Sequence, residues 1–158
     1  MKRKIPLALI SVLLVGVGVA QAVPSRPSSG TVVKSVFNAK LKRAILVDGH
    51  GMTLYLFTGD WQGKSGCVDD AAHHCIKVWP ALTTQGSPQG GAGVKRALLG
   101  TTTRADGTVQ VTYANHPLYR FRGGLWTGKP GDRKPGDVRS QALLTVWYVV
   151  SPAGAAIK

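Results

Sequence analysis

Apolar residues with β-branched or aromatic side chains occur in short runs separated by glycine-rich turns, a pattern typical of β-strands. Two turns, Asp48-Gly49-His50-Gly51 and Arg104-Ala105-Asp106-Gly107, carry the aspartate and glycine that tight hairpins favour, because glycine readily adopts positive φ. Helix is predicted only as short turns near 71–78 and 94–99. We therefore expect an all-β protein, a single small domain of two related repeats with long Gly/Pro loops and little helix. The expected strands are residues 44–47, 52–57, 98–103, 108–113, 117–121 and 143–150.

The first 22 residues have the pattern of a secretory signal peptide. Met1-Lys2-Arg3-Lys4 gives a positive start, an apolar run follows, and Ala20-Gln21-Ala22 offers the small residues that a leader peptidase accepts. The alternative is a retained anchor, but an apolar run of about 16 residues is short for a span of about 20. We expect an exported protein, periplasmic or secreted, with no membrane span after the signal is removed.

After the predicted signal peptide, the sequence is expected to divide into a tether and one folded domain. Residues 23–41 are assigned to a flexible tether because they begin with a stretch rich in Pro, Ser and Gly. Residues 42–154 are assigned to a β domain of two repeats, at about 42–97 and 98–154.

Two cysteines are present, Cys67 and Cys75. Export places them in an oxidising compartment, where such a pair usually forms a structural disulfide. The alternative is a redox or metal-binding pair, although the spacing is not that of a C-x-x-C motif.

A sequence repeat supports the division into two related parts. Leu54-Tyr55-Leu56-Phe57 matches Leu118-Tyr119-Arg120-Phe121 at an offset of 64 residues, and Val78-Trp79 matches Val146-Trp147 at an offset of 68. Two half-sheets that each bury one apolar face against the other would account for such a duplication.

The aromatic residues of the repeated segment are expected to share a face. Side chains alternate along a strand, so Tyr55 lies on the same side as Phe57, and Tyr119 on the same side as Phe121. We expect these rings in the core. The alternative is that the tyrosine hydroxyls line a groove and bind a ligand.

The segment Tyr55-Leu56-Phe57-Thr58-Gly59-Asp60 has the form Tyr-x-(Phe/Trp/Tyr)-x-x-Asp. With its surroundings, residues 42–154, it resembles the bacterial secreted-repeat family, predicted lipoproteins that share this motif. The family has no assigned function. The resemblance implies export, a β-rich repeat and a bridge between Cys67 and Cys75.

The sequence departs from that family in three ways. Gly124 stands where the second copy should have its aspartate, which puts in doubt any role that needs two carboxylates. Cys67 and Cys75 are further apart than in the relatives. No cysteine lies next to the predicted cleavage site, so we expect a soluble protein without a lipid anchor.

Metal binding is the strongest chemical candidate. Asp69, His73 and His74 crowd into one loop with Cys75, and histidine and carboxylate are common transition-metal ligands. However, neighbouring histidines point apart and a disulfide-bonded Cys75 cannot ligate as a thiolate, so a polar exposed loop is the favoured interpretation. We expect no cofactor.

No catalytic motif is recognised. Gly63-Lys64-Ser65-Gly66-Cys67 departs from G-x-S-x-G at its last position, the chain has no glutamate, and a Walker motif is missing. An enzyme would have to assemble its residues from distant loops, so we lean against one.

The chain is strongly basic, with 20 Lys and Arg against seven Asp and a formal charge of +13. The charge is spread along the sequence, which together with export argues against a nucleic-acid partner. It favours weak, salt-sensitive attraction to anionic envelope polymers. Simple solubility is the alternative explanation.

These observations predict an exported, non-catalytic envelope-associated or binding module, present as a monomer. Its partner would be an anionic envelope polymer or another protein. The alternatives are a small-ligand or transition-metal binding protein that uses residues 69–75, and an enzyme of unrecognised type.

Overall fold

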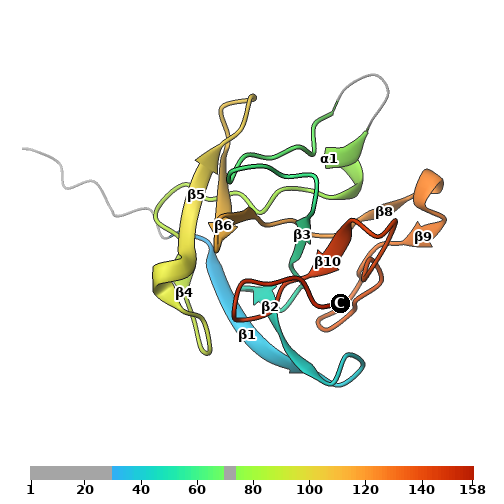
Figure 1. Ribbon diagram of the computed structural model, residues 1–158, viewed down its shortest axis with the longest axis horizontal. Coiled ribbons are helices and arrows are strands. Elements are labelled where there is room, and N and C mark those ends of the chain that lie inside the picture. Colours follow the sequence, from blue (N-terminus) through green and yellow to red (C-terminus); the bar gives the residue numbers. More distant parts are fainter. Residues whose placement is uncertain (1–29, 70–73) are drawn as a thin grey trace, which may run out of the picture.

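The computed structural model describes residues 30–69 and 74–158, which are built almost entirely from short strands and turns (Figure 1). This confirms the predicted all-β class. The elements in chain order are β1 (Val32–Asn38), β2 (Arg43–Asp48), β3 (Tyr55–Phe57), α1 (Cys75–Val78), β4 (Gln89–Gly90), the 3-10 turn η1 (Arg96–Leu98), β5 (Leu99–Thr103), β6 (Val109–Tyr113), β7 (His116–Pro117), β8 (Gly123–Gly124), the 3-10 turn η2 (Leu125–Thr127), β9 (Lys129–Pro130) and β10 (Trp147–Val149).

Strand β1 lies within residues 23–41, which the sequence predicted to be a flexible tether. It pairs antiparallel with β2, from Val33 opposite Asp48 to Asn38 opposite Arg43, and parallel with β4 on its other side. Residues 32–38 form their backbone hydrogen bonds within this sheet. The prediction of a flexible tether that extends to residue 41 is therefore wrong for this stretch. The predicted signal peptide and residues 23–29 lie outside the described residues.

Both turns predicted from aspartate and glycine are present. Gly107 has φ of 80° and donates its N–H to the Arg104 carbonyl at 3.0 Å, closing the β5–β6 hairpin. In the other turn, the Asp48 carboxylate accepts the N–H groups of His50 and Met52 at 2.8 and 2.9 Å. Beyond this turn Thr53 bridges to Val47, but β3 itself pairs with β10.

The two repeats exchange their tryptophan strands. β10, which carries Trp147, pairs with β3 of the first repeat. In return, the segment that starts at Trp79 pairs with residues 119–122 of the second repeat: Arg120 and Arg122 donate their N–H groups to the carbonyls of Pro80 and Val78. Neither repeat therefore supplies all the strands of its own sheet. Two intertwined half-sheets take the place of the expected pair of separate ones.

An approximate two-fold relation runs between the two tyrosines. Tyr55 and Tyr119 exchange backbone hydrogen bonds, at 2.9 and 3.0 Å, and so join the two halves. The partner strands follow the same relation, because Leu82 donates its N–H to Leu118 and Val150 donates to Leu54. The sequence offsets of 64 and 68 residues thus correspond to equivalent places in the fold.

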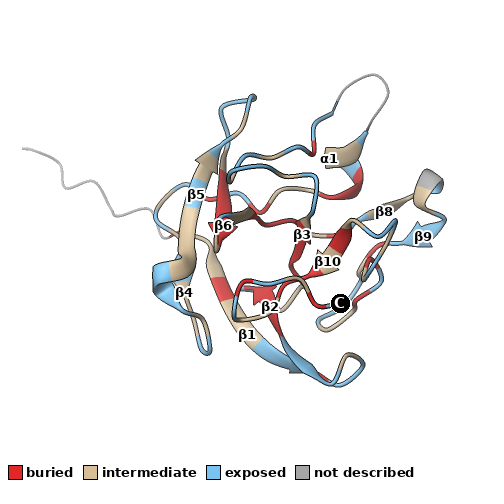
Figure 2. Ribbon diagram, in the orientation of Figure 1, coloured by how far each residue is buried: buried red, intermediate tan, exposed pale blue. Residues whose placement is uncertain are grey.

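Aromatic rings from both repeats meet in one core, as expected. Phe57 stacks on Trp147 at 4.5 Å between ring centroids, Trp147 stacks on Trp79 at 4.2 Å, and Trp79 lies 5.4 Å from Phe121. A second cluster of buried aliphatic residues includes Leu46, Leu56 and Leu118. Figure 2 shows the buried residues concentrated on the central strands β2, β3, β6 and β10.

Several predicted elements are shorter than expected. The strand at 143–150 contracts to β10 because Ala142, Leu144 and Thr145 have positive φ and form turns. In place of the strand predicted at 117–121, the structure has the short strand β7 and isolated bridges at Tyr119. The two helical candidates are the single turns α1 and η1. Among the residues that the structure describes, no helix is long and apolar enough to cross a membrane.

Candidate functional site

The tyrosines of the repeated motif are core residues. Tyr55 and Tyr119 are fully buried, Phe121 is buried, and Phe57 is partly buried against Trp147. The alternating strand pattern thus turns all four rings inward, as the core interpretation predicts. The tyrosine hydroxyls do not line a groove, because carboxylates inside the protein accept their hydrogen bonds.

Asp60 accepts the hydroxyl of the opposite repeat. Its Oδ1 atom receives Tyr119 Oη at 2.9 Å and the Gly66 N–H at 2.8 Å. Its backbone N–H donates to the Phe57 carbonyl. The motif therefore sets Asp60 one turn beyond its own strand, where it reaches the tyrosine of the other half. The Oδ2 atom of Asp60 is buried without a hydrogen-bond partner among residues 30–69 and 74–158.

Asp132 likewise accepts the tyrosine hydroxyl of the opposite repeat, and it was not among the site residues predicted from the sequence. Its N–H donates to the Phe121 carbonyl, its Oδ2 accepts Tyr55 Oη at 2.8 Å and its Oδ1 accepts the Arg139 N–H. The doubt raised by Gly124 is resolved: the carboxylate is present eight positions later.

The hairpin β8–β9 causes this shift. It lies between Phe121 and Asp132, and Gly123 pairs with Pro130. The sequence contains Lys-Pro-Gly-Asp twice here, at residues 129–132 and 134–137. Only the second copy forms a turn, in which Asp137 donates its N–H to the Lys134 carbonyl and Gly136 has φ of 82°. In the first, Lys129 and Pro130 belong to β9.

Burial raises the pKa of both Asp60 and Asp132 to about 6. Hydrogen bonds from Gly66 and Tyr119 oppose this rise in the pKa of Asp60, and those from Arg139 and Tyr55 oppose it in the pKa of Asp132. Burial also raises the pKa of each tyrosine, with the adjacent carboxylate adding to the effect. The hydroxyls therefore remain protonated and donate to the carboxyl groups.

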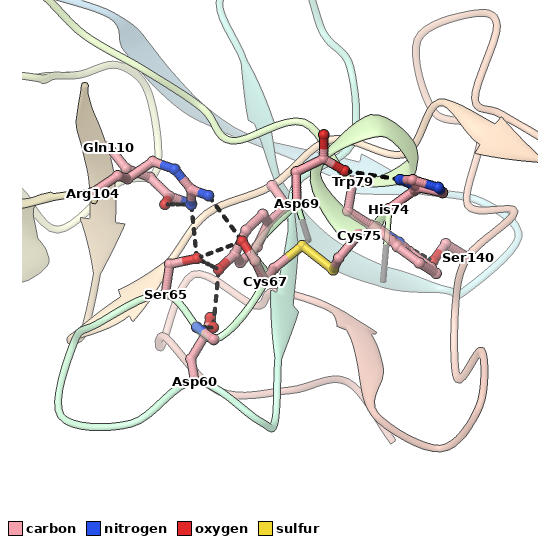
Figure 3. Close-up of a disulfide and its surroundings, with 12 residues drawn as sticks. Asp60, Ser65, Cys67, Asp69, His74, Cys75, Trp79, Arg104, Gln110 and Ser140 are labelled. Atoms are coloured by element: carbon pink, nitrogen blue, oxygen red, sulfur yellow. Dashed lines mark hydrogen bonds and ion pairs between the residues drawn. A yellow bond between two sulfur atoms is a disulfide. The ribbon is translucent and has the colours of Figure 1, made fainter. Parts of the chain in front are cut away.

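The Arg104 guanidinium binds the disulfide loop next to the hydrogen-bonded pair Asp60 and Tyr119 (Figure 3). Arg104 donates from Nη1 to Ser65 Oγ and Gln110 Oε1, both at 2.7 Å, and from Nη2 to the Cys67 carbonyl at 2.8 Å. Tyr119 Oη also lies 2.8 Å from Ser65 Oγ. Arg104 is thus fixed by acceptors on the disulfide loop and on β6.

Cys67 and Cys75 form the predicted disulfide, with 5.4 Å between their Cα atoms. It joins the loop after Asp60 to the start of α1. Trp79, beyond α1, donates its Nε1–H to Ser140 Oγ at 2.9 Å. The bridge therefore belongs to the framework around the aromatic core.

The predicted metal ligands are only partly brought together. Asp69 Oδ1 lies 3.4 Å from His74 Nδ1, and Lys77 Nζ lies 3.7 Å from Asp69 Oδ2. Cys75 is in the disulfide, and His73 lies outside the described residues. Within the described part of the chain, no three His, Cys, Asp or Glu residues cluster for a metal ion. Metal binding here stays a prediction.

The Ser65 hydroxyl is held by several hydrogen bonds. Its Oγ accepts one hydrogen bond from Arg104 and donates toward the Cys67 carbonyl at 3.2 Å. Among the described residues, no histidine or carboxylate side chain makes a hydrogen bond to this hydroxyl.

Two arginines lie on the surface beside the half-buried Asp132. Arg120 and Arg122 line a cleft of about 200 Å³ with Met52, Thr53, Pro80, Phe121 and Asp132. Arg122 also lines a neighbouring cleft of about 530 Å³ formed by the hairpin β8–β9, to which Lys129 contributes. Cations therefore gather where the second repeat differs from the first.

Comparison with known proteins identifies the family. No curated protein and no solved structure matches the chain. A family model described as a secreted repeat of unknown function matches residues 42–83 and 100–151, more than half of the chain. The two matched segments each contain one Tyr-x-Phe strand and one tryptophan strand, the units that the fold exchanges. The chain therefore belongs to this family of secreted repeats, as the residues of its motif had suggested.

Proposed function

We propose that this protein is a non-catalytic binding module that acts outside the cytoplasm, in the periplasm or the medium, and associates with anionic polymers of the envelope. Membership of a secreted family supports the location. We propose that the mature protein is soluble, because no cysteine lies next to the predicted cleavage site to carry a lipid.

The distribution of charge carries this proposal. The described residues contain sixteen Lys and Arg against six Asp. Two of these aspartates, Asp60 and Asp132, hold tyrosine hydroxyls, and Asp48 and Asp137 pair with Arg120 and Arg139. Asp69 lies near Lys77. Little negative charge is left to neutralise the remaining cations.

These cations are exposed on several elements. None of the following makes an ion pair with another described residue, and a polyanion could therefore gain contacts without breaking existing ones. They are Lys40, Lys42, Arg43, Lys64, Lys95, Arg96, Arg122, Lys129, Arg133 and Lys134.

Retention on immobilised polymers tests the proposal. The mature protein is applied at about 50 mM NaCl to poly(glycerol phosphate), to polyglutamate and to neutral dextran, and eluted with a salt gradient. We expect retention on both polyanions, release before about 0.5 M salt and no retention on dextran, because screening weakens exposed charge interactions.

Passage of the protein through both polyanion columns would overturn the proposal. Elution that does not change up to 1 M salt would also overturn it, since the attraction would then not be electrostatic. A monomer of the same size and net charge near zero serves as the control for non-specific retention.

A further inference from the structure

The outward face of the Tyr-x-Phe strand differs between the two repeats. Tyr119 and Phe121 point into the core, so Arg120 and Arg122 lie together on the opposite side of the strand. The equivalent residues of the first repeat are Leu56, which is buried in the aliphatic cluster, and Thr58. The second repeat therefore has a pair of arginines where the first has a buried leucine and an exposed threonine.

The two arginines present donors to the smaller cleft. Arg120 uses Nε to hold Asp48 Oδ2 at 2.6 Å, and its side chain is 40% exposed. Among the described residues, the terminal nitrogens of Arg120 and the guanidinium of Arg122 make no hydrogen bond within the protein. The pairing with buried Asp48 fixes Arg120 in place and leaves its terminal N–H groups for a ligand.

The larger cleft adds a third cation beside the first two. The hairpin β8–β9, which has no counterpart between Phe57 and Asp60, carries Lys129 and the fully exposed Leu125. Arg122 borders both clefts. Arg120, Arg122 and Lys129 thus follow one another across adjoining hollows of the surface.

We infer that the two adjoining clefts bind consecutive phosphodiester groups of a linear polymer, one between Arg120 and Arg122 and the next between Arg122 and Lys129. This inference rests on the proposed function and names the chemical class of its ligand.

A phosphodiester fits these clefts better than a carboxylate does. The planar guanidinium fork matches two oxygens of either group, but the tetrahedral phosphate, unlike the flat carboxylate, lets two arginines on one strand face approach it from different directions. A diester also carries carbon on both sides of its charge. Met52, Pro80 and Phe121 offer apolar contact beside the first group, and Leu125 and Pro130 beside the second.

Asp132 gives the smaller cleft a dependence on pH. It lines the cleft with Arg120 and Arg122, and it also faces Tyr55, Asp137 and Arg139. Because burial raises the pKa of Asp132 to about 6, its negative charge is lost as the pH falls from 7 to 5. A phosphodiester keeps its single charge over this range. Binding should therefore tighten at lower pH as repulsion from Asp132 disappears.

The experiment measures binding of a synthetic glycerol phosphate oligomer with two internal diesters to the full mature protein by heteronuclear NMR titration. Dimethyl phosphate, inorganic phosphate and triglutamate are the comparison ligands. We expect the oligomer to bind at least about tenfold more tightly than dimethyl phosphate or triglutamate, because it occupies both clefts. Shifts should centre on residues 120–130.

Three variants sharpen the test. Arg122→Thr installs the residue of the first repeat and should weaken oligomer binding about tenfold or more, as expected for losing charge-assisted hydrogen bonds. Arg120→Lys keeps the charge beside Asp48 and should weaken binding through loss of the fork. Lys158→Gln is the control: it removes one positive charge at an exposed residue that lines neither cleft and should change affinity less than about twofold.

Other outcomes overturn the inference in distinguishable ways. Equal affinity for triglutamate and the oligomer, or equal loss in Arg122→Thr and Lys158→Gln, would leave the polyanion proposal standing and reject the phosphodiester site. Inorganic phosphate that binds as tightly as the oligomer would indicate a site for a free anion instead. Absence of binding to every anion would reject both proposals.

Discussion

At the scale of single residues, two tyrosine hydroxyls and two carboxyl groups hold the repeats together. Tyr119 donates to Asp60 of the first repeat, and Tyr55 donates to Asp132 of the second. Each bond crosses from one repeat to the other. Such pairs are costly to break, because a buried acceptor that loses its donor keeps its desolvation cost.

The substitution Tyr119→Phe tests the value of one such bond. We expect the free energy of unfolding in urea at pH 7 to fall by about 1 to 3 kcal/mol, since Asp60 and Ser65 each lose a partner. Tyr148→Phe is the matched control, because among the described residues its hydroxyl bonds only to the Thr145 carbonyl near the surface. A change within about 0.5 kcal/mol is expected there. Equal effects in both variants would contradict the role given to the Tyr119 hydroxyl.

At the scale of elements, the exchange of tryptophan strands decides how the protein is stabilised. β10 completes the sheet of the first repeat, and the segment from Trp79 completes that of the second. Trp79 and Trp147 stack with 2° between their planes at the point where the halves meet. An isolated repeat would lack a strand and expose these rings, so the two repeats should unfold as one unit.

Native-state hydrogen exchange can follow this coupling. The N–H groups of Leu82 and Val150 occupy equivalent positions in the two halves and bond to Leu118 and Leu54. We expect both to exchange with the free energy of global unfolding, and with the same dependence on denaturant. Gly128, in the turn between β8 and β9, should exchange at much lower energy. Two distinct unfolding energies for Leu82 and Val150 would show that the repeats open independently.

At the scale of the whole molecule, the half-buried carboxyl groups of Asp60 and Asp132 make stability depend on pH. The pKa of Asp60 and of Asp132 is raised from 3.8 to about 6, so the folded protein binds more protons than the unfolded chain between these values. Stability from this source is fully present below pH 4 and is lost as the pH rises through about 6. Asp137, whose pKa is lowered by the Arg133 N–H, acts in the opposite direction only below about pH 4.

Urea unfolding at pH 4.5 and pH 7.5 measures this effect. We expect the wild-type protein to be more stable at the lower pH by about 1 to 3 kcal/mol, after allowance for partial exposure of both groups. The double variant Asp60→Asn, Asp132→Asn should lose most of this difference, because neither amide titrates. Greater stability at pH 7.5 than at pH 4.5 would contradict the assignment of the two groups.

Much of the architecture follows from the sequence alone. Alternating apolar residues and the turns at Asp48 and Asp106 predict strands and hairpins, since these preferences are local. The repeated Tyr-x-Phe and Val-Trp segments predict a duplication whose rings share a core. Export chemistry predicts the bond between Cys67 and Cys75. Each of these depends on residues close in sequence or on chemistry common to all exported proteins.

The tertiary structure decided which strands pair and where the second carboxylate lies. Local patterns do not specify that β10 joins β3, because strand partners are chosen by long-range burial and register. Nor do they show that a hairpin moves the aspartate of the second repeat from position 124 to 132, or that Arg120 and Arg122 come to border two clefts. These features arise from contacts between distant residues, which only the folded chain brings together.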